Sequence, residues 1–84
     1  MPTPTSKLSV SIIHPDKVLF IGLADYIVAP GRQSNFGIMP GHTPFFAELI
    51  KGDIYISGEK EDLVAIEGGI LKVRADSVVI LADA

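Results

Sequence analysis

Alternating apolar and polar residues recur along nearly the whole chain. In LSVSI at 8–12, Leu8, Val10 and Ile12 fall on one face of an extended strand and two serines on the other. Further runs rich in β-branched and aromatic residues follow at regular intervals. The pattern predicts nine strands, at 8–12, 18–22, 25–30, 36–39, 45–50, 54–57, 63–67, 70–75 and 78–82.

Residues typical of turns separate these runs. HPDK at 14–17, KGD at 51–53 and the charged GEKED at 58–62 are predicted to be turns. The pair Gly68 and Gly69 predicts a bulge or a positive φ between two strands. No window shows a helical period with caps. The sequence therefore predicts an all-β fold, a two-sheet antiparallel β-sandwich or flattened barrel.

A core for this sandwich follows from the apolar positions of the predicted strands, one face of each strand turning inward. The predicted core residues are Leu8, Val10, Ile12, Phe20, Ile27, Ile38, Leu49, Ile54, Ile56, Val64, Ile66, Leu71, Val73, Val79 and Leu81.

The length of 84 residues predicts one domain. The opening MPTPTS has two prolines and no apolar period, so we expect a flexible arm at 1–7 and a folded domain at 8–84. Hydrophobic residues make up 48% of the chain, and the mean hydropathy of +0.40 is high for so small a domain. Some of this apolar surface is therefore expected to meet a partner.

Charge and cysteine content exclude several classes of function. The net charge is −3 and the seven basic residues are scattered, which argues against a nucleic-acid partner. The chain has no cysteine, so it forms neither a disulfide nor a thiolate metal site. It has no apolar signal core and no 18-residue apolar run. We expect it to reach a membrane only through a partner.

Two histidines, His14 and His42, are the main candidates for chemistry. A zinc site needs three or four ligands, and two histidines in different loops do not supply them. His42 could act as a general base, but only Thr43 offers a polar side chain beside it. The alternative is that His42 caps a turn or contacts a neighbouring subunit. No phosphate-binding glycine motif is present, and no metal, nucleotide or cofactor is predicted.

Three ordered motifs carry a resemblance to a known family. They are Gly37-Ile38-Met39-Pro40-Gly41-His42-Thr43-Pro44, the stretch from Gly68 to Val73 followed by Val78 to Asp83, and the opening VSIIHPDKVLFIG. From about Leu8 to the last residue, the chain resembles the N-terminal β-sandwich domain of the ε subunit of F-type ATP synthases.

The resemblance implies a two-sheet sandwich of about ten short strands and a rotor subunit of the central stalk. Such a subunit performs no chemistry itself. It links the γ subunit to the c-ring, on the cytoplasmic-side or equivalent organellar face of an energy-transducing membrane, and so couples ion translocation to ATP synthesis. Most relatives continue into a helical hairpin after the position of Ala84. The resemblance therefore leads us to expect either a naturally short member or one domain of a longer protein; as a short form it should lack that hairpin's brake on hydrolysis and its ATP site.

The resemblance also assigns roles to residues. Arg32, Gln33, Ser34 and Asn35 match the loop that faces the c-ring, and His14 and His42 match positions that face γ. The residues of the structural turn motif are Gly37, Pro40, Gly41, Pro44, Gly68 and Gly69. The family often has acidic residues and a glycine in the ring-facing loop, where this chain has Gln33, Ser34 and Asn35. Neutral hydrogen bonds or Arg32 would make the ring contact here.

Two alternatives belong to other classes. A lipoyl- or biotinyl-type carrier, or another small β binding module, has a similar size, and Lys60 stands at a predicted hairpin tip as an attachment lysine would. That lysine has neither Met nor Ala beside it. A small enzyme that uses His42 is the second alternative.

Overall fold

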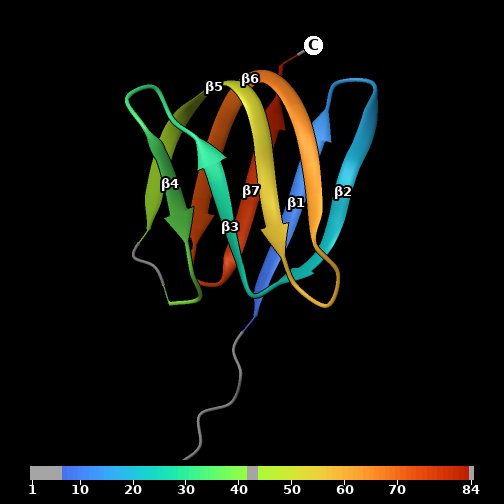
Figure 1. Ribbon diagram of the computed structural model, residues 1–84, viewed down its shortest axis with the longest axis vertical. Helices are drawn as coiled ribbons and strands as arrows, with labels where there is room; N and C mark the ends of the chain where they lie inside the picture. Colours follow the sequence, from blue (N-terminus) through green and yellow to red (C-terminus); the bar gives the residue numbers. More distant parts are fainter. Residues whose placement is uncertain (1–6, 42–43, 84) are drawn as a thin grey trace, which may run out of the picture.

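The computed structural model describes residues 7–41 and 44–83, which form seven β-strands joined by short connections (Figure 1). The strands are β1 (Leu8–His14), β2 (Lys17–Ala24), β3 (Tyr26–Pro30), β4 (Asn35–Ile38), β5 (Phe45–Ser57), β6 (Asp62–Arg74) and β7 (Ser77–Ala82). The described part of the chain contains no helix. The predicted all-β class is confirmed.

All seven strands belong to one sheet, in the order β2-β1-β7-β6-β5-β3-β4. Every neighbouring pair is antiparallel except β1 and β7, which run parallel from the pair Ser9–Ser77 to the pair Ile13–Leu81. The prediction of a wholly antiparallel sandwich is wrong at this pair. A hairpin forces antiparallel pairing, but the first and last strands are not joined by one, so their direction follows from the overall topology.

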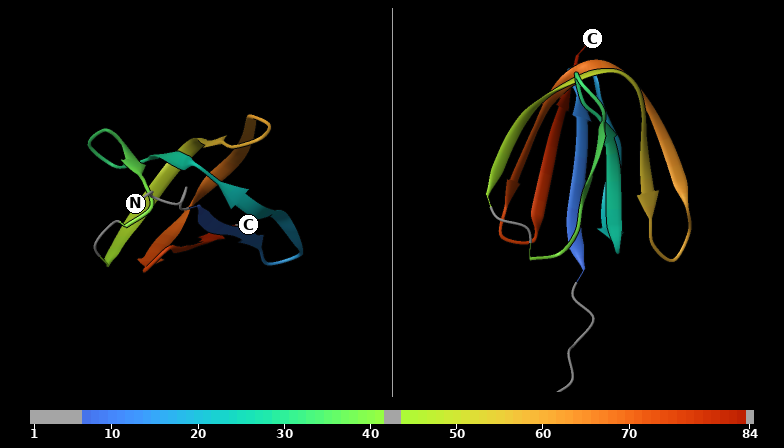
Figure 2. Two further views of the ribbon diagram at one scale, coloured as in Figure 1. Left: turned by 90° about the horizontal axis from the view of Figure 1, so that it is seen from below. Right: turned by 60° about the vertical axis from the view of Figure 1, so that its left-hand side comes forward.

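The sheet becomes a sandwich because β5 and β6 fold over together (Figure 2). Each is 13 residues long, and they pair from Phe45–Val73 to Ile56–Asp62. The first layer consists of β2, β1 and β7 together with the second half of β6 and the first half of β5. The second layer consists of the first half of β6 and the second half of β5 together with β3 and β4. The two layers are therefore one continuous sheet, where two separate sheets were predicted.

This fold-over also explains the strand count. The sequence predicted a turn at 51–53 and a break at 68–69, whereas both strands run through these positions with unchanged register. Gly68 and Gly69 have φ of +148° and +154°, a conformation that other residues rarely adopt, and they let β6 bend without ending. The nine predicted segments thus become seven strands, and the expected number of about ten is too high.

The core lies between the layers and consists of apolar side chains. Its buried members are Leu8, Val10, Ile12, Ala24, Ile27, Ala29, Ile38, Leu49, Ile54, Ile56, Ile66, Leu71, Val73, Val78, Ile80 and Ala82. The predicted Phe20 and Val64 are partly buried and pack against this core. The prediction is wrong for Val79 and Leu81, because β7 turns Val78, Ile80 and Ala82 inward. VVILA is apolar throughout, so its pattern does not reveal which face is buried.

Candidate functional site

The outer face of the first layer is unusually rich in exposed apolar side chains. We call the following eight residues the apolar face: Ile13, Val18, Ile21, Leu23, Phe46, Ile50, Ile70 and Leu81. They come from five strands, and Ile21, Leu23 and Phe46 are each about two-thirds exposed, at 68%, 66% and 67%. Such a concentration of exposed apolar side chains on one face marks a site of interaction.

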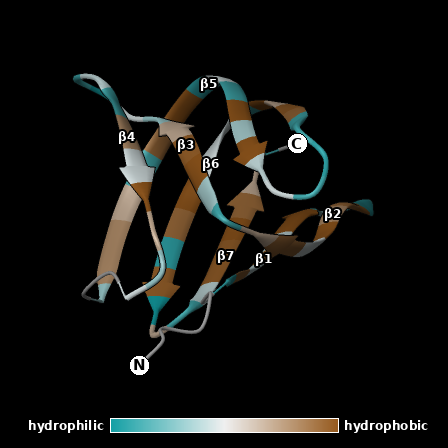
Figure 3. Ribbon diagram, turned by 60° about the horizontal axis from the view of Figure 1, so that its bottom comes forward, coloured by the Kyte–Doolittle hydropathy of each residue, from teal (hydrophilic) through white to brown (hydrophobic). Residues whose placement is uncertain are grey.

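Sheet register places these side chains side by side. Ile13 of β1 lies opposite Val18 of β2 on one side and Leu81 of β7 on the other, and Leu81 in turn lies opposite Ile70 of β6. Partners in register point to the same side of a sheet, so an apolar row crosses four strands. Colouring by hydropathy shows β7 as hydrophobic along most of its length (Figure 3).

The outer face of the second layer is different. Of the exposed large hydrophobic residues, Leu63 lies there, opposite Tyr55 in the β5–β6 pair, and Met39, 62% exposed, directly follows β4. The Tyr55 ring packs against that of Tyr26, with ring centroids 6.0 Å apart. A hydrogen bond to Glu61 is the main cause that raises the pKa of Tyr55 above its ordinary value. The large apolar surface therefore belongs to one side of the sandwich.

The loop that joins β3 to β4 contains three of the predicted ring-facing residues, and the fourth, Asn35, is the first residue of β4 and pairs with Pro30; all four are exposed. Arg32 bends back to β5, where its Nη2 donates a hydrogen bond to Oε1 of Glu48 over 2.8 Å. This hydrogen bond, together with the charge of Glu48, raises the pKa of Arg32. The guanidinium is therefore already partnered, and Gln33, Ser34 and Asn35 supply neutral groups at the tip.

His14 ends β1, at the same end of the sandwich as the β3–β4 loop (Figure 1). Its Nδ1 accepts a hydrogen bond from the backbone N–H of Asp16 over 3.1 Å, so the neutral ring has its proton on Nε2. The ring thereby closes the β1–β2 turn. This local role needs no ligand or second titrating group.

His42 lies outside the described residues, but the segment before it is placed. The N–H of Gly41 donates to Oδ1 of Asp76 over 2.8 Å, and the N–H of Ser9 donates to the Asp76 backbone oxygen over 2.7 Å. Gly41 therefore lies near the start of β1, whereas His14 ends that strand. The seven residues of β1 span roughly 20 Å, so Gly41 and His14 lie toward opposite ends of the sandwich.

The predicted turn residues occupy different kinds of backbone. Gly41, at φ +82°, follows β4 in the connection to β5, and Pro40 and Pro44 lie in the same connection. Gly68 and Gly69 form the bend of β6. Gly37 lies inside β4 opposite Val28, in a pair of ordinary register.

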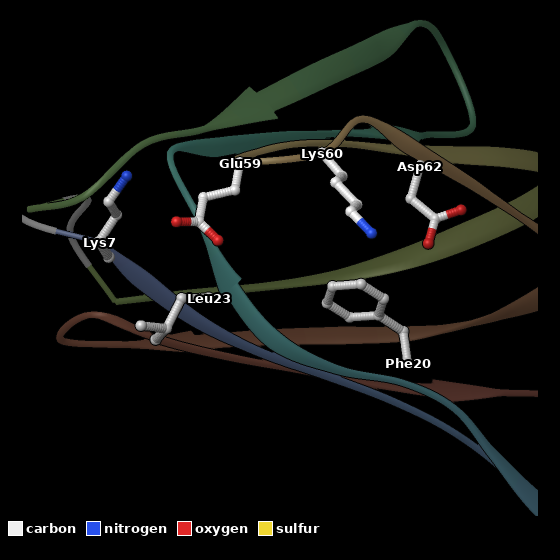
Figure 4. Close-up of a pocket in the computed structure, with 6 residues that line it drawn as sticks. All are labelled: Lys7, Phe20, Leu23, Glu59, Lys60 and Asp62. Atoms are coloured by element: carbon white, nitrogen blue, oxygen red, sulfur yellow. The ribbon is translucent and has the colours of Figure 1, made fainter.

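A hollow of about 530 Å³ opens between β2 and the β5–β6 hairpin tip (Figure 4). Phe20 and Leu23 form its apolar floor, and charged side chains, including Lys60 and Asp62, surround it. Lys60 extends toward the Phe20 ring (Figure 4). The residues that line the hollow include no histidine.

Neither metal chemistry nor a helical membrane anchor is supported by the residues at 7–41 and 44–83. They contain no group of three or more His, Asp or Glu side chains placed to hold a metal ion. They also contain no helix that could cross a membrane. What the described surface does offer is the apolar face, with the polar β3–β4 loop at one end.

Sequence reasoning did not assign the apolar face to a partner. The signal was present in VLFIG at 18–22 and VVILA at 78–82, which are apolar at successive positions. Such a strand is apolar on both sides, so one side faces the core and the other needs separate cover.

Comparison with known proteins identifies relatives of this domain. The ε chain of Leptospira interrogans ATP synthase is 40% identical over 79 residues, which are 93% of this chain and 62% of the relative. The ε chain of Leptospira borgpetersenii is 44% identical over 78 residues, covering 92% of this chain and 61% of the relative. The chain thus spans about three-fifths of the length of these curated relatives.

Solved structures show the same fold at low identity. A chain of the Euglena gracilis mitochondrial ATP synthase superposes with a TM-score of 0.85 at 20% identity, over 98% of this chain and 53% of that one. A chain of the central stalk and c-ring structure of the Tetrahymena thermophila enzyme gives 0.78 at 20% identity, over 98% and 67%.

The family model described as "ATP synthase, Delta/Epsilon chain, beta-sandwich domain" matches residues 7–84. This match favours the resemblance carried by the three motifs over the carrier and enzyme alternatives. The chain belongs to the family of ATP synthase δ/ε-chain β-sandwich domains.

Proposed function

We propose that this chain is an ε-type rotor subunit, which joins the γ subunit to the c-ring in the central stalk of an ATP synthase. The apolar face is the observation that supports this function most strongly. It gathers eight exposed large apolar side chains, and it lies on the first layer, where the sheet holds these side chains in fixed register. In this proposal γ covers the apolar face.

The second contact of the proposal is with the c-ring, through Arg32, Gln33, Ser34 and Asn35. The loop lies at one end of the sandwich and the apolar face on its side, so one domain can meet two partners at once (Figure 1). The His14 turn lies at the corner between these two surfaces, since Ile13 and Val18 adjoin it on the apolar face. His14 therefore contacts γ at the border with the ring.

A subunit that transmits torque must be stiff, and in this proposal the chain catalyses no reaction itself. Torque passes from ring to γ through a folded sheet in which β5 and β6 belong to both layers, so the layers do not slide past each other as separate sheets could. The chain acts as an accessory subunit, and the whole complex holds it against the membrane surface, on the side of the catalytic domain.

Binding to γ tests the proposal. The recombinant chain and the γ subunit from the same source are mixed at micromolar concentration and analysed by gel filtration. We expect a single peak that contains both proteins. Two separate peaks would count against the proposal.

A matched pair of variants locates the contact. Leu81→Ser changes the apolar face, and Leu63→Ser changes a residue of similar exposure, 62% against 52%, on the outer face of the second layer. We expect Leu81→Ser to weaken γ binding by about tenfold or more, as loss of a central interface side chain does. Leu63→Ser should bind as the unchanged chain does. If Leu81→Ser and Leu63→Ser weakened γ binding equally, γ would not bind at the apolar face.

A further inference from the structure

Two cations interrupt the lower part of the first layer's outer face. Lys72 and Arg74 occupy successive outward positions of β6, after Ile70 on the same strand. In register, Lys72 lies between Phe46 of β5 and Val79 of β7. The apolar face thus passes into a positively charged end, although the chain as a whole is negative.

These two cations, like Lys17 and Lys60, have no ion-pair partner among the described residues, but they alone lie next to each other on the outer face of one strand. Lys7 pairs with Asp25, Arg32 with Glu48, and Lys51 with Glu67. Within the described residues, no carboxylate lies within ion-pair distance of Lys72 or Arg74. Their charges are therefore available to an outside group.

A hollow lies beside the two cations. It has a volume of about 470 Å³, and Pro44, Phe45, Phe46, Lys72, Val73 and Arg74 line it. Phe45 packs edge-on against Phe36 of β4, with ring centroids 5.4 Å apart, which fixes one wall. The hollow combines an aromatic wall with two cationic groups, and this combination fits an apolar side chain that has a carboxylate next to it.

We infer that the partner segment over this end of the face is acidic: a stretch of γ that places an apolar side chain in the hollow and carboxylates against Lys72 and Arg74. This inference rests on the proposed function, since it names the chemistry of γ at the same site. A partner that covered the two cations without opposite charge would bury them uncompensated, which is strongly unfavourable. Complementary charge also speeds encounter and fixes the orientation of the docked partner.

Charge reversal with a matched control tests the inference. Lys72→Glu is compared with Lys60→Glu, which changes net charge equally at the exposed β5–β6 hairpin tip, in the hollow beside Leu23 and outside the hollow that Lys72 lines. Binding of each variant to the recombinant γ subunit is measured by isothermal titration calorimetry. At low ionic strength we expect Lys72→Glu to raise Kd by about five- to tenfold. Lys60→Glu and the charge-conserving Lys72→Arg should leave Kd within about twofold.

Two further measurements test whether the effect of Lys72→Glu on γ binding is electrostatic: one varies the salt concentration, and the other exchanges charges between the two partners. Near 1 M salt, where the Debye length is about 3 Å, the difference between Lys72→Glu and the unchanged chain should nearly disappear. Replacing a carboxylate of γ by lysine should restore binding of Lys72→Glu. Circular dichroism should show an intact fold, because Lys72 is exposed.

The outcomes separate this inference from the proposed function. If the unchanged chain binds γ and Lys72→Glu binds as Lys60→Glu does, the acidic segment is refuted and the rotor function stands. If the unchanged chain does not bind γ at all, the rotor function and this inference both fail.

Discussion

Gly69 is the residue on which the folding-over of the sheet depends most, and replacing it by alanine gives a quantitative test. Its φ of +154° is strained for any residue with a side chain. A Cβ there would lie 2.3 Å from the carbonyl oxygen of Leu81 and 3.1 Å from Cα of Ala82. Both atoms belong to the backbone of β7, so no side-chain rotation relieves the overlap.

The expected loss combines two effects. The backbone strain costs about 1–3 kcal/mol, and overpacking against β7 costs about 1–3 kcal/mol more. A domain of 84 residues has a free energy of unfolding of roughly 4–12 kcal/mol. The combined loss of about 2–6 kcal/mol is at least about a sixth of this free energy of unfolding, and at the low end of the stability range it would leave Gly69→Ala largely unfolded.

Two other glycines provide controls that isolate the effects. Gly41 has φ of +82° but no atom within 4 Å of its added Cβ, so Gly41→Ala should cost only the backbone term of about 1–2 kcal/mol. Gly37 needs no positive φ, and its added Cβ would lie 3.7 Å from the Ile27 oxygen, an ordinary contact. Gly37→Ala should change stability by less than about 1 kcal/mol.

The assay is urea unfolding followed by far-ultraviolet circular dichroism, with the midpoint and the m-value measured for each variant. The predicted order of stability is Gly37→Ala, then Gly41→Ala, then Gly69→Ala. If Gly69→Ala were no less stable than Gly41→Ala, β7 could not lie against the bend as described, and the reasoning would be refuted.

Three further predictions concern the β6–β7 hairpin. Ala75 has φ of 56° at the first position of a two-residue loop, where glycine is favoured, so Ala75→Gly should raise the free energy of unfolding by about 0.5–1 kcal/mol, and a lower urea midpoint would contradict this. Ile80→Ala should cost about 2–5 kcal/mol because the side chain is fully buried, whereas Leu81→Ala should change stability little; thermal unfolding of the two tests the register of β7. Asp76→Ala removes the acceptor of the Gly41 N–H and should speed amide exchange at Gly41, measured by NMR; unchanged exchange would exclude that hydrogen bond.

Much of the fold was predictable because turn residues and alternation mark most strands locally. LSVSI has one apolar side, and Leu8, Val10 and Ile12 are indeed buried. The same reasoning failed at 51–53 and 68–69, where glycine-containing segments bend long strands without ending them. A glycine permits a turn and a bend equally well, and only the packing of two layers decides between them.

The candidate site was less predictable, for a related reason. The sequence of a uniformly apolar strand does not show which of its residues face the core, so the inward residues of VVILA could not be assigned. Leu81 was therefore predicted to lie in the core, whereas it lies on the apolar face. Likewise, the positive end of that face depends on Lys72 and Arg74 meeting Phe46 across β5 and β6. Phe46 and Lys72 pair at the open end of the long β5–β6 hairpin, 26 residues apart, so no local pattern shows that they meet.

The central claim, that γ covers the outer face of the first layer, is tested most directly by methyl NMR. The chain, labelled at its Ile, Leu and Val methyl groups, is titrated with unlabelled γ. Shifts or broadening should concentrate on Ile21, Ile70 and Leu81, while Leu63 on the opposite face stays unchanged. If Leu63 responded and those three residues did not, the apolar face would not be the γ-binding surface.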